Sequence, residues 1–154
     1  MKSRLKIVSI ALIATLALSG CSFSREVTSL ISYAPSDGNQ VDFEFVKARN
    51  FMVISADGES GVILGSLVND GVNASTAEVQ FVQPDGERVS RSFDIPSGTK
   101  VAIGYNDSEP FPITIDVIPG SLVTLFFIVD GVPASLEVPV LDGSLEEYRP
   151  FIQP

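Results

Sequence analysis

The sequence LVTLFFIVDGVPASLEVPVL, residues 122–141, contains the pattern that decides the fold. Apart from one threonine, residues 122–129 are apolar and rich in β-branched and aromatic side chains, which is typical of a central strand. Asp130-Gly131 follows, and Asp-Gly is a strong hairpin signal because both central positions of the tight turn favour a positive φ. Apolar and polar residues then alternate over 136–140. The stretch therefore predicts two strands joined by a turn.

The same signals recur along the chain. Apolar and polar residues alternate with a period of two in several other segments, which is the pattern of a strand with one buried face. These segments are 41–45, 77–81 and 111–117, and a second continuous apolar run lies at 51–54. Asp-Gly, Pro-Gly and similar turn clusters separate them. We expect an all-β fold, an immunoglobulin-like or cupredoxin-like antiparallel β-sandwich of about seven to nine strands.

The domain boundaries follow from the turn signals. A proline–glycine cluster at 33–38 marks the start of the β-sandwich, which we place at residues 35–145. Residues 146–154 are bracketed by prolines and are interpreted as a C-terminal tail. Arg91 interrupts an alternation in residues 87–94, so this segment is predicted to be an edge strand or to carry a bulge.

The N-terminus has the pattern of a secretory signal peptide. Residues 1–20 begin with three basic residues, continue with an apolar stretch at 7–18 and end in Ser19-Gly20. An uncleaved membrane anchor is the alternative, but the apolar stretch is shorter than the roughly 20 residues that a membrane-spanning helix needs.

The ending Leu18-Ser19-Gly20-Cys21 resembles the lipobox of bacterial lipoproteins. The resemblance implies cleavage between Gly20 and Cys21 and transfer of a diacylglyceryl group to the Cys21 thiol. Two acyl chains are enough for stable anchoring. The alternative, a free and reactive cysteine in a secreted protein, would leave the only thiol of the chain unpaired. Residues 21–34 would then be a lipidated tether on the extracytoplasmic face of the cell membrane.

The charge balance excludes several classes of partner. Residues 1–20 hold three of the ten basic residues and no acidic one, so the processed chain has seven basic against 19 acidic residues, a formal net charge of −12. Nucleic-acid binding requires a basic face, and electrostatic adhesion to anionic lipid requires positive charge. We therefore expect no nucleic-acid partner and a covalent membrane anchor.

Few residues are suited to catalysis. The chain has no histidine, which excludes histidine-based triads, general bases and metal ligands, and it has no phosphate-binding glycine motif. Paired acids can catalyse glycoside hydrolysis, but the pairs here are expected on solvated strand faces or turns. They are Asp42 with Glu44 and Asp85 with Glu87.

Calcium and serine–lysine chemistry are weaker alternatives. Residues 57–59 and 106–109 offer oxygen ligands without the spacing of an EF-hand, and turn chemistry explains them equally well. Lys47 and Lys100 are the only lysines after residue 20, and neither lies in a Ser-x-x-Lys motif.

Residues 33–38, 46–54 and 65–69 resemble small secreted lipoproteins of actinobacteria, the LpqE-like group. Some of these resemble periplasmic copper chaperones of the PCu(A)C type, which hold Cu(I) with histidines and methionines. This chain lacks that ligand set, because Met52 is its only methionine after residue 20. The resemblance implies the fold, whereas Met52 is expected to fill the core.

We therefore expect a lipid-anchored, non-catalytic binding or protein-interaction module of the cell envelope, with no cofactor and no metal ligands. An exposed edge at 87–94 would allow strand addition by a partner. The alternatives are a metal-binding or small-ligand-binding protein, by analogy with the copper chaperones, and, less favoured, an enzyme using acids or a serine.

Overall fold

The fold is built around the hairpin of residues 122–141. The computed structural model describes residues 36–105 and 108–152. In it, β8 (Leu122–Val129) pairs antiparallel with β9 (Val132–Leu141) from Leu122↔Pro139 to Val129↔Val132. Asp130 and Gly131 have φ values of 48° and 83°, both positive as a two-residue type I′ turn requires. The predicted turn therefore sets the register of this strand pair.

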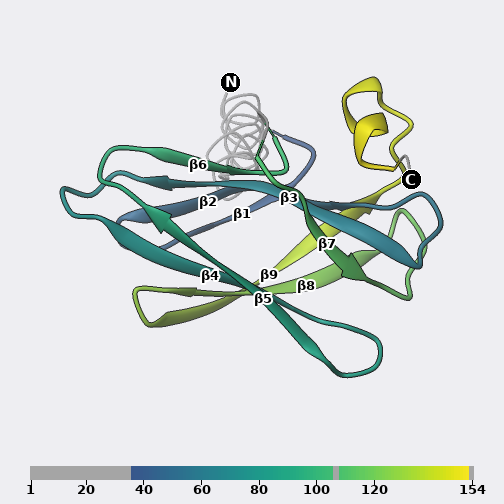
Figure 1. The fold of residues 1–154 in the computed structure, drawn as a ribbon, viewed down its shortest axis with the longest axis horizontal. Coiled ribbons are helices and arrows are strands. Elements are labelled where there is room, and N and C mark those ends of the chain that lie inside the picture. The colour runs from purple at the N-terminus through teal and green to yellow at the C-terminus, as the bar shows by residue number, and fades with distance from the viewer. Residues whose placement is uncertain (1–35, 106–107, 153–154) are drawn as a thin grey trace, which may run out of the picture. The chain divides into compact units, whose positions relative to one another are not determined.

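The described residues form nine strands in two layers (Figure 1). The strands before β8 are β1 (Asn39–Asp42), β2 (Val46–Ile54), β3 (Ser60–Asn69), β4 (Ser75–Val82), β5 (Arg88–Ile95), β6 (Lys100–Ile103) and β7 (Phe111–Thr114). One layer has the order β5-β4-β8-β9. In the other, β2 pairs with β1 and β3, and β3 pairs with β6 and β7. The prediction of an all-β sandwich is confirmed.

One pairing departs from the predicted antiparallel arrangement. The end of β2 pairs in parallel with the end of β9, through Val53↔Val140 and Ile54↔Leu141. This contact joins the two layers into the strand order β5-β4-β8-β9-β2-β3-β6. The prediction of a wholly antiparallel sandwich is wrong at this seam. Alternation along a strand reports which face is buried, but it contains no information on the direction of a neighbour that is distant in sequence.

The main core lies between the layers, where their inward side chains meet. Phe51 of β2 contacts Phe127 of β8 edge to face, with ring centroids 4.9 Å apart. Gly65 of β3 makes room for this contact, because a Cβ at this position would lie 2.7 Å from the Phe51 ring. Both phenylalanines belong to the continuous apolar runs of the sequence, so these two runs meet at the centre of the domain.

A second, smaller core lies on the outer side of β2 and β3. Met52, Ile54 and Leu64 are fully buried, although they alternate with residues of the main core and point away from it. Partly buried side chains complete this cluster; they are Val62, Tyr105, Leu141, Phe151 and Ile152. The β2–β3 layer is therefore covered by apolar groups on both faces.

Residues from the C-terminal part of the chain pack over this outer side. Glu146–Phe151 form a 3-10 helix whose Tyr148 is 4% exposed. The Tyr148 hydroxyl donates a hydrogen bond to Asp37 Oδ2 at 2.6 Å. Burial, and then this bond, raise the pKa of Tyr148 above the usual tyrosine range. Up to residue 152, the segment interpreted as a tail is instead packed on the domain, because its Tyr148, Phe151 and Ile152 belong to the cluster around Met52 and Leu64.

β5 is an edge strand, which is one of the two outcomes that the interruption at Arg91 predicted; the other was a bulge. It ends the strand order, and within the described residues it pairs with β4 alone. Arg91 points toward the other layer, where its Nη1 donates to the carbonyl oxygens of Glu109 and Pro110 at 3.2 and 3.0 Å. Its guanidinium lies 4.9 Å from the centroid of the Phe111 ring. A charged residue on the inward side is thus held by the chain between β6 and β7.

Two substitutions of Tyr148 distinguish the stability that comes from its buried ring from the stability that comes from its hydrogen bond to Asp37. We expect Tyr148→Ala to lower the free energy of unfolding by about 3 kcal/mol, because it removes a buried aromatic ring. Tyr148→Phe keeps the ring and should cost about 1 kcal/mol for the lost bond to Asp37. Urea unfolding of the purified full-length chain measures both, with Arg149→Ala, an exposed neighbour, as the control. An unchanged midpoint for Tyr148→Ala would show that the segment does not support the fold.

Candidate functional site

The residues predicted to carry the membrane anchor, Gly20 and Cys21, lie outside the described residues. Lipidation at Cys21 and cleavage before it therefore stay predictions. None of the helices in the described ranges is long and apolar enough to cross a membrane.

Of the four carboxylates considered for catalysis, Asp42 and Asp85 are engaged in local contacts, and Glu44 and Glu87 are exposed. Asp42 at the end of β1 forms an ion pair with Arg49 of β2. Asp85 lies in the turn between β4 and β5, where its Oδ1 accepts a hydrogen bond from the backbone N–H of Glu87 at 2.9 Å. These contacts stabilise a strand pair and a turn, so they explain both acids without a catalytic role.

Asp57, considered as a calcium ligand, is directed toward its own turn between β2 and β3. Its Oδ1 accepts hydrogen bonds from the N–H groups of Glu59 and Ser60 at 2.9 and 3.0 Å. The bond from Ser60 and then that from Glu59 lower the pKa of Asp57 to about 2. The carboxylate therefore closes the turn. In the second calcium candidate, 106–109, residues 106 and 107 lie outside the described residues.

The methionine considered for soft-metal binding and the two lysines considered for catalysis lie in the core, in an ion pair and on the surface. Across residues 36–105 and 108–152, no group of three or more histidine, cysteine, aspartate or glutamate residues is placed to hold a metal ion. Met52 is fully buried in the smaller core, with its Sδ 3.9 Å from the Tyr105 hydroxyl. Lys47 forms an ion pair with Asp70, and Lys100 begins β6 with an exposed side chain.

A hollow of about 420 Å³ lies beside the turn between β2 and β3. Its polar lining includes Ser55, Asp57 and Ser60. Ser55 Oγ donates to the carbonyl oxygen of Ser60 at 2.6 Å and accepts from the N–H of Gly58 at 3.0 Å. A ligand site needs polar groups that can orient the ligand. Here these groups bond to one another across the turn.

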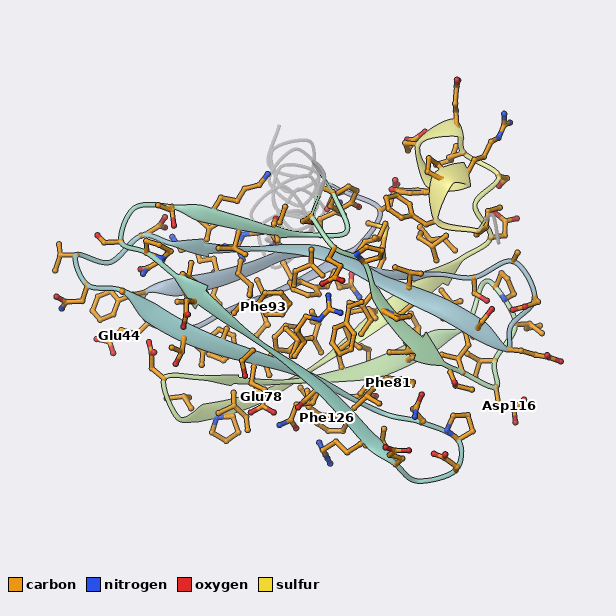
Figure 2. The ribbon with its side chains drawn as sticks, viewed as in Figure 1. Glu44, Glu78, Phe81, Phe93, Asp116 and Phe126 are labelled. Atoms are coloured by element: carbon orange, nitrogen blue, oxygen red, sulfur yellow. The ribbon has the colours of Figure 1, made fainter. Side chains whose placement is uncertain are left out.

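The feature with the character of a binding site is the outer face of the β4-β8-β9 sheet. Figure 2 shows Phe93 in the interior between the layers, whereas Phe126 lies on the outer side of the layer that contains β8. The pairing places Gln80 opposite Phe126, Ile128 opposite Pro133 and Leu122 opposite Pro139. We call the apolar residues of this face the outer patch; they are Val82, Leu122, Phe126, Ile128, Pro133 and Pro139.

The outer patch is open to solvent within the described residues. Leu122 is 55% exposed and Val82 37%, and the side chain of Phe126 is half-buried. A shallow hollow of about 350 Å³ surrounds Phe126 and continues along Pro133 and Ser135. Small-molecule sites are concave and enclose their ligand. A shallow surface with exposed apolar side chains and polar groups around them instead has the character of a contact with another protein.

Polar side chains frame the centre of the patch. The Arg88 guanidinium lies 4.9 Å from the centroid of the Phe126 ring, and its Nη1 donates to Gln80 Oε1 at 2.7 Å. Hydrogen bonds from Ser90 and then Gln80, followed by the charge of Arg88, lower the pKa of Glu78. Three strands thus hold these groups in a fixed arrangement around one aromatic ring.

Reasoning from the sequence did not identify this patch. The continuous apolar run 122–129 predicts a central strand, and β8 is indeed central in its layer. However, a strand of this composition can have both faces covered or one face left for a partner. The absence of alternation in β8 was the available signal, because its neighbours β4 and β9 both contain polar residues on the outer side.

Comparison with models of known protein families gives no match, and comparison with curated proteins gives none either. The resemblance to LpqE-like lipoproteins therefore stays a prediction.

The lowered pKa of Asp57 predicts the direction in which the stability of the folded chain changes with pH. Its pKa is about 2 in the folded chain against 3.8 for the free group, so its contribution to stability is present above pH 3.8 and is lost as the pH falls toward 2. We expect Asp57→Asn to keep the acceptor oxygen but to flatten this part of the stability profile. Denaturant midpoints of both full-length chains between pH 2 and 6 measure the difference. Parallel profiles would contradict the assignment.

Proposed function

We propose that the protein is a lipid-anchored, non-catalytic module of the cell envelope that binds a protein partner through the outer patch. The observation that supports this proposal is a difference between the outer sides of the two layers. Both have apolar side chains on their outer sides, but within the described residues the chain covers those of only one layer.

The comparison between β2 and β8 makes the difference concrete. On β2, Met52 and Ile54 face outward and are fully buried beneath the C-terminal segment. On β8, Phe126 and Ile128 face outward, and no described segment lies over them. Exposed apolar groups that gather on one face of a sheet mark an interaction site, whereas scattered ones do not.

The charges around the outer patch suggest the chemistry of the partner. Glu78 of β4, Asp94 of β5 and Glu137 of β9 lie on the same side of the sheet as Phe126. Arg88 is the basic group among them, and its guanidinium lies over the ring of Phe126. Complementary charges guide association and fix its orientation. We therefore expect a protein surface that is apolar at its centre and basic at its rim.

The anchor would supply the location. The lipobox at residues 18–21 is the support for placing the domain at the extracytoplasmic face of the membrane, with Cys21 as the attachment point. A module fixed to the membrane meets envelope partners at a raised local concentration, so a patch of moderate affinity is sufficient.

Substitution of the central aromatic residue tests the proposal. We expect in-cell crosslinking of the tagged full-length chain, followed by mass spectrometry, to give a reproducible envelope partner. Phe126→Ser should reduce its recovery on the order of tenfold, because buried aromatic residues dominate such contacts. Phe45→Ser is the matched control, since Phe45 is 52% exposed and lies in the turn between β1 and β2, outside the strands that carry the outer patch.

Two further results separate the parts of the proposal. Cys21→Ala should lose the partner if the anchor is required, and retain it if the outer patch alone is sufficient. Equal recovery with Phe126→Ser and with the unchanged chain would exclude the outer patch as the contact. If no partner is captured, titration of the same chain with Cu(I), Ca²⁺ or small ligands would take precedence.

A further inference from the structure

The free edge of β5 has backbone groups whose direction can be derived from the hairpin. At its base, the N–H of Gln83 donates to the carbonyl oxygen of Glu87 at 2.8 Å. Hydrogen-bonded pairs of an antiparallel ladder recur at every second residue. Val89, Arg91 and Phe93 therefore bond to β4. The residues between and beside them direct their N–H and C=O groups away from β4; they are Arg88, Ser90, Ser92 and Asp94.

These four residues are accessible. All four side chains are exposed and lie on the outer side of the sheet. Among the described residues, no backbone hydrogen bond satisfies their outward N–H and C=O groups. The hydrogen bonds that β5 makes with the other layer come from elsewhere on the strand, namely from the Arg91 side chain and from the carbonyl oxygen of Ile95, which accepts from Asn69 Nδ2 at 2.9 Å. Such an edge is a template for another strand.

We propose that the occupant of this edge is the β5 strand of a second copy of the chain, paired antiparallel about a twofold axis at Arg91. In this register Arg88 of each copy lies opposite Asp94 of the other, which gives two pairs of opposite charge. Ser90 lies opposite Ser92, also twice. Opposite charges and hydroxyl pairs directly across a sheet are favourable.

The backbone pattern selects the same register. With the axis at Arg91, the outward N–H and C=O groups of each copy meet those of the other along the whole strand. An axis between two residues would set outward groups against groups already bonded to β4. An axis at Ser90 or Ser92 would align the groups but shorten the overlap and separate Arg88 from Asp94. The self-complementary charges are what favour a second copy over an unrelated strand.

The inward side of the new pair is compatible with this arrangement. Val89 lies opposite Phe93, an apolar pair that continues the core side of the sheet. Arg91 lies opposite its own copy, which is the one unfavourable pairing. Each Arg91 guanidinium is, however, already bound by the carbonyl oxygens of Glu109 and Pro110 of its own chain. The inference depends neither on the lipid anchor nor on a partner at the outer patch.

Disulfide trapping in the full-length chain tests the register. Cys21→Ala removes the natural thiol, and two such chains, one with Ser90→Cys and one with Ser92→Cys, are mixed and oxidised. A hydrogen-bonded pair places the two Cα atoms about 5.5 Å apart, within the range of a disulfide. We expect a disulfide-linked dimer in the mixture. Thr76→Cys, an exposed position on β4, replaces either partner as the control and should not crosslink.

Charge exchange tests the pairing itself. When both chains carry Arg88→Asp, acids face acids, and the yield should fall at least about fivefold. When one chain carries Arg88→Asp and the other Asp94→Arg, opposite charges face each other again and the yield should recover. Recovery in the mixture shows that the loss was not due to misfolding, since both variants take part in it.

Three results would overturn the proposal. They are a crosslink no stronger than the Thr76→Cys control, equal yields for matched and mismatched charges, and, in intact cells that contain both the Ser90→Cys and the Ser92→Cys chain, disulfides of these chains with a different protein instead of with each other.

Discussion

A strand that is apolar on both faces has to be covered on both or bind something on one, and two such strands organise this protein. Phe51 of β2 and Phe127 of β8 face inward and meet at the centre of the core. The residues next to them in sequence, Met52 and Phe126, necessarily point outward, because side chains alternate along a strand. The chain covers Met52 with its own C-terminal segment, whereas Phe126 is half-buried beside Arg88 and no described segment lies over it.

Local signals in the sequence were sufficient for several of the strands, for the turns between them and for one exposed edge. Asp130-Gly131 predicted a tight turn, and its two positive φ values are those of the predicted type. Arg91 predicted an edge strand or a bulge, because a charge on the inward side is costly to bury in a central strand, and β5 indeed ends the strand order. Each of these inferences depends on residues within a few positions of one another, where the physical constraint is complete in the sequence itself.

Long-range arrangement was not predictable in the same way. The parallel contact of Val53 with Val140 depends on where two distant strands meet, which no periodicity encodes. The burial of Tyr148 depends on an apolar outer face of β2 and β3 that exists only after the sheet has formed. The acidic composition gave no site because many acids serve turns. Asp57, Asp85 and Asp142 each accept a hydrogen bond from a backbone N–H two residues further on.

The outer patch and the β5 edge lie on the same sheet, which has a consequence for binding. Two copies joined through β5 would form one continuous sheet, with two outer patches on the same face and a twofold axis between them. A partner with two matching surfaces would then bind both patches at once, and the second contact would form at a high effective concentration. Neither patch alone needs high affinity. The residues of the edge are small or charged and those of the patch are apolar, as expected if one surface sets the assembly and the other provides the binding.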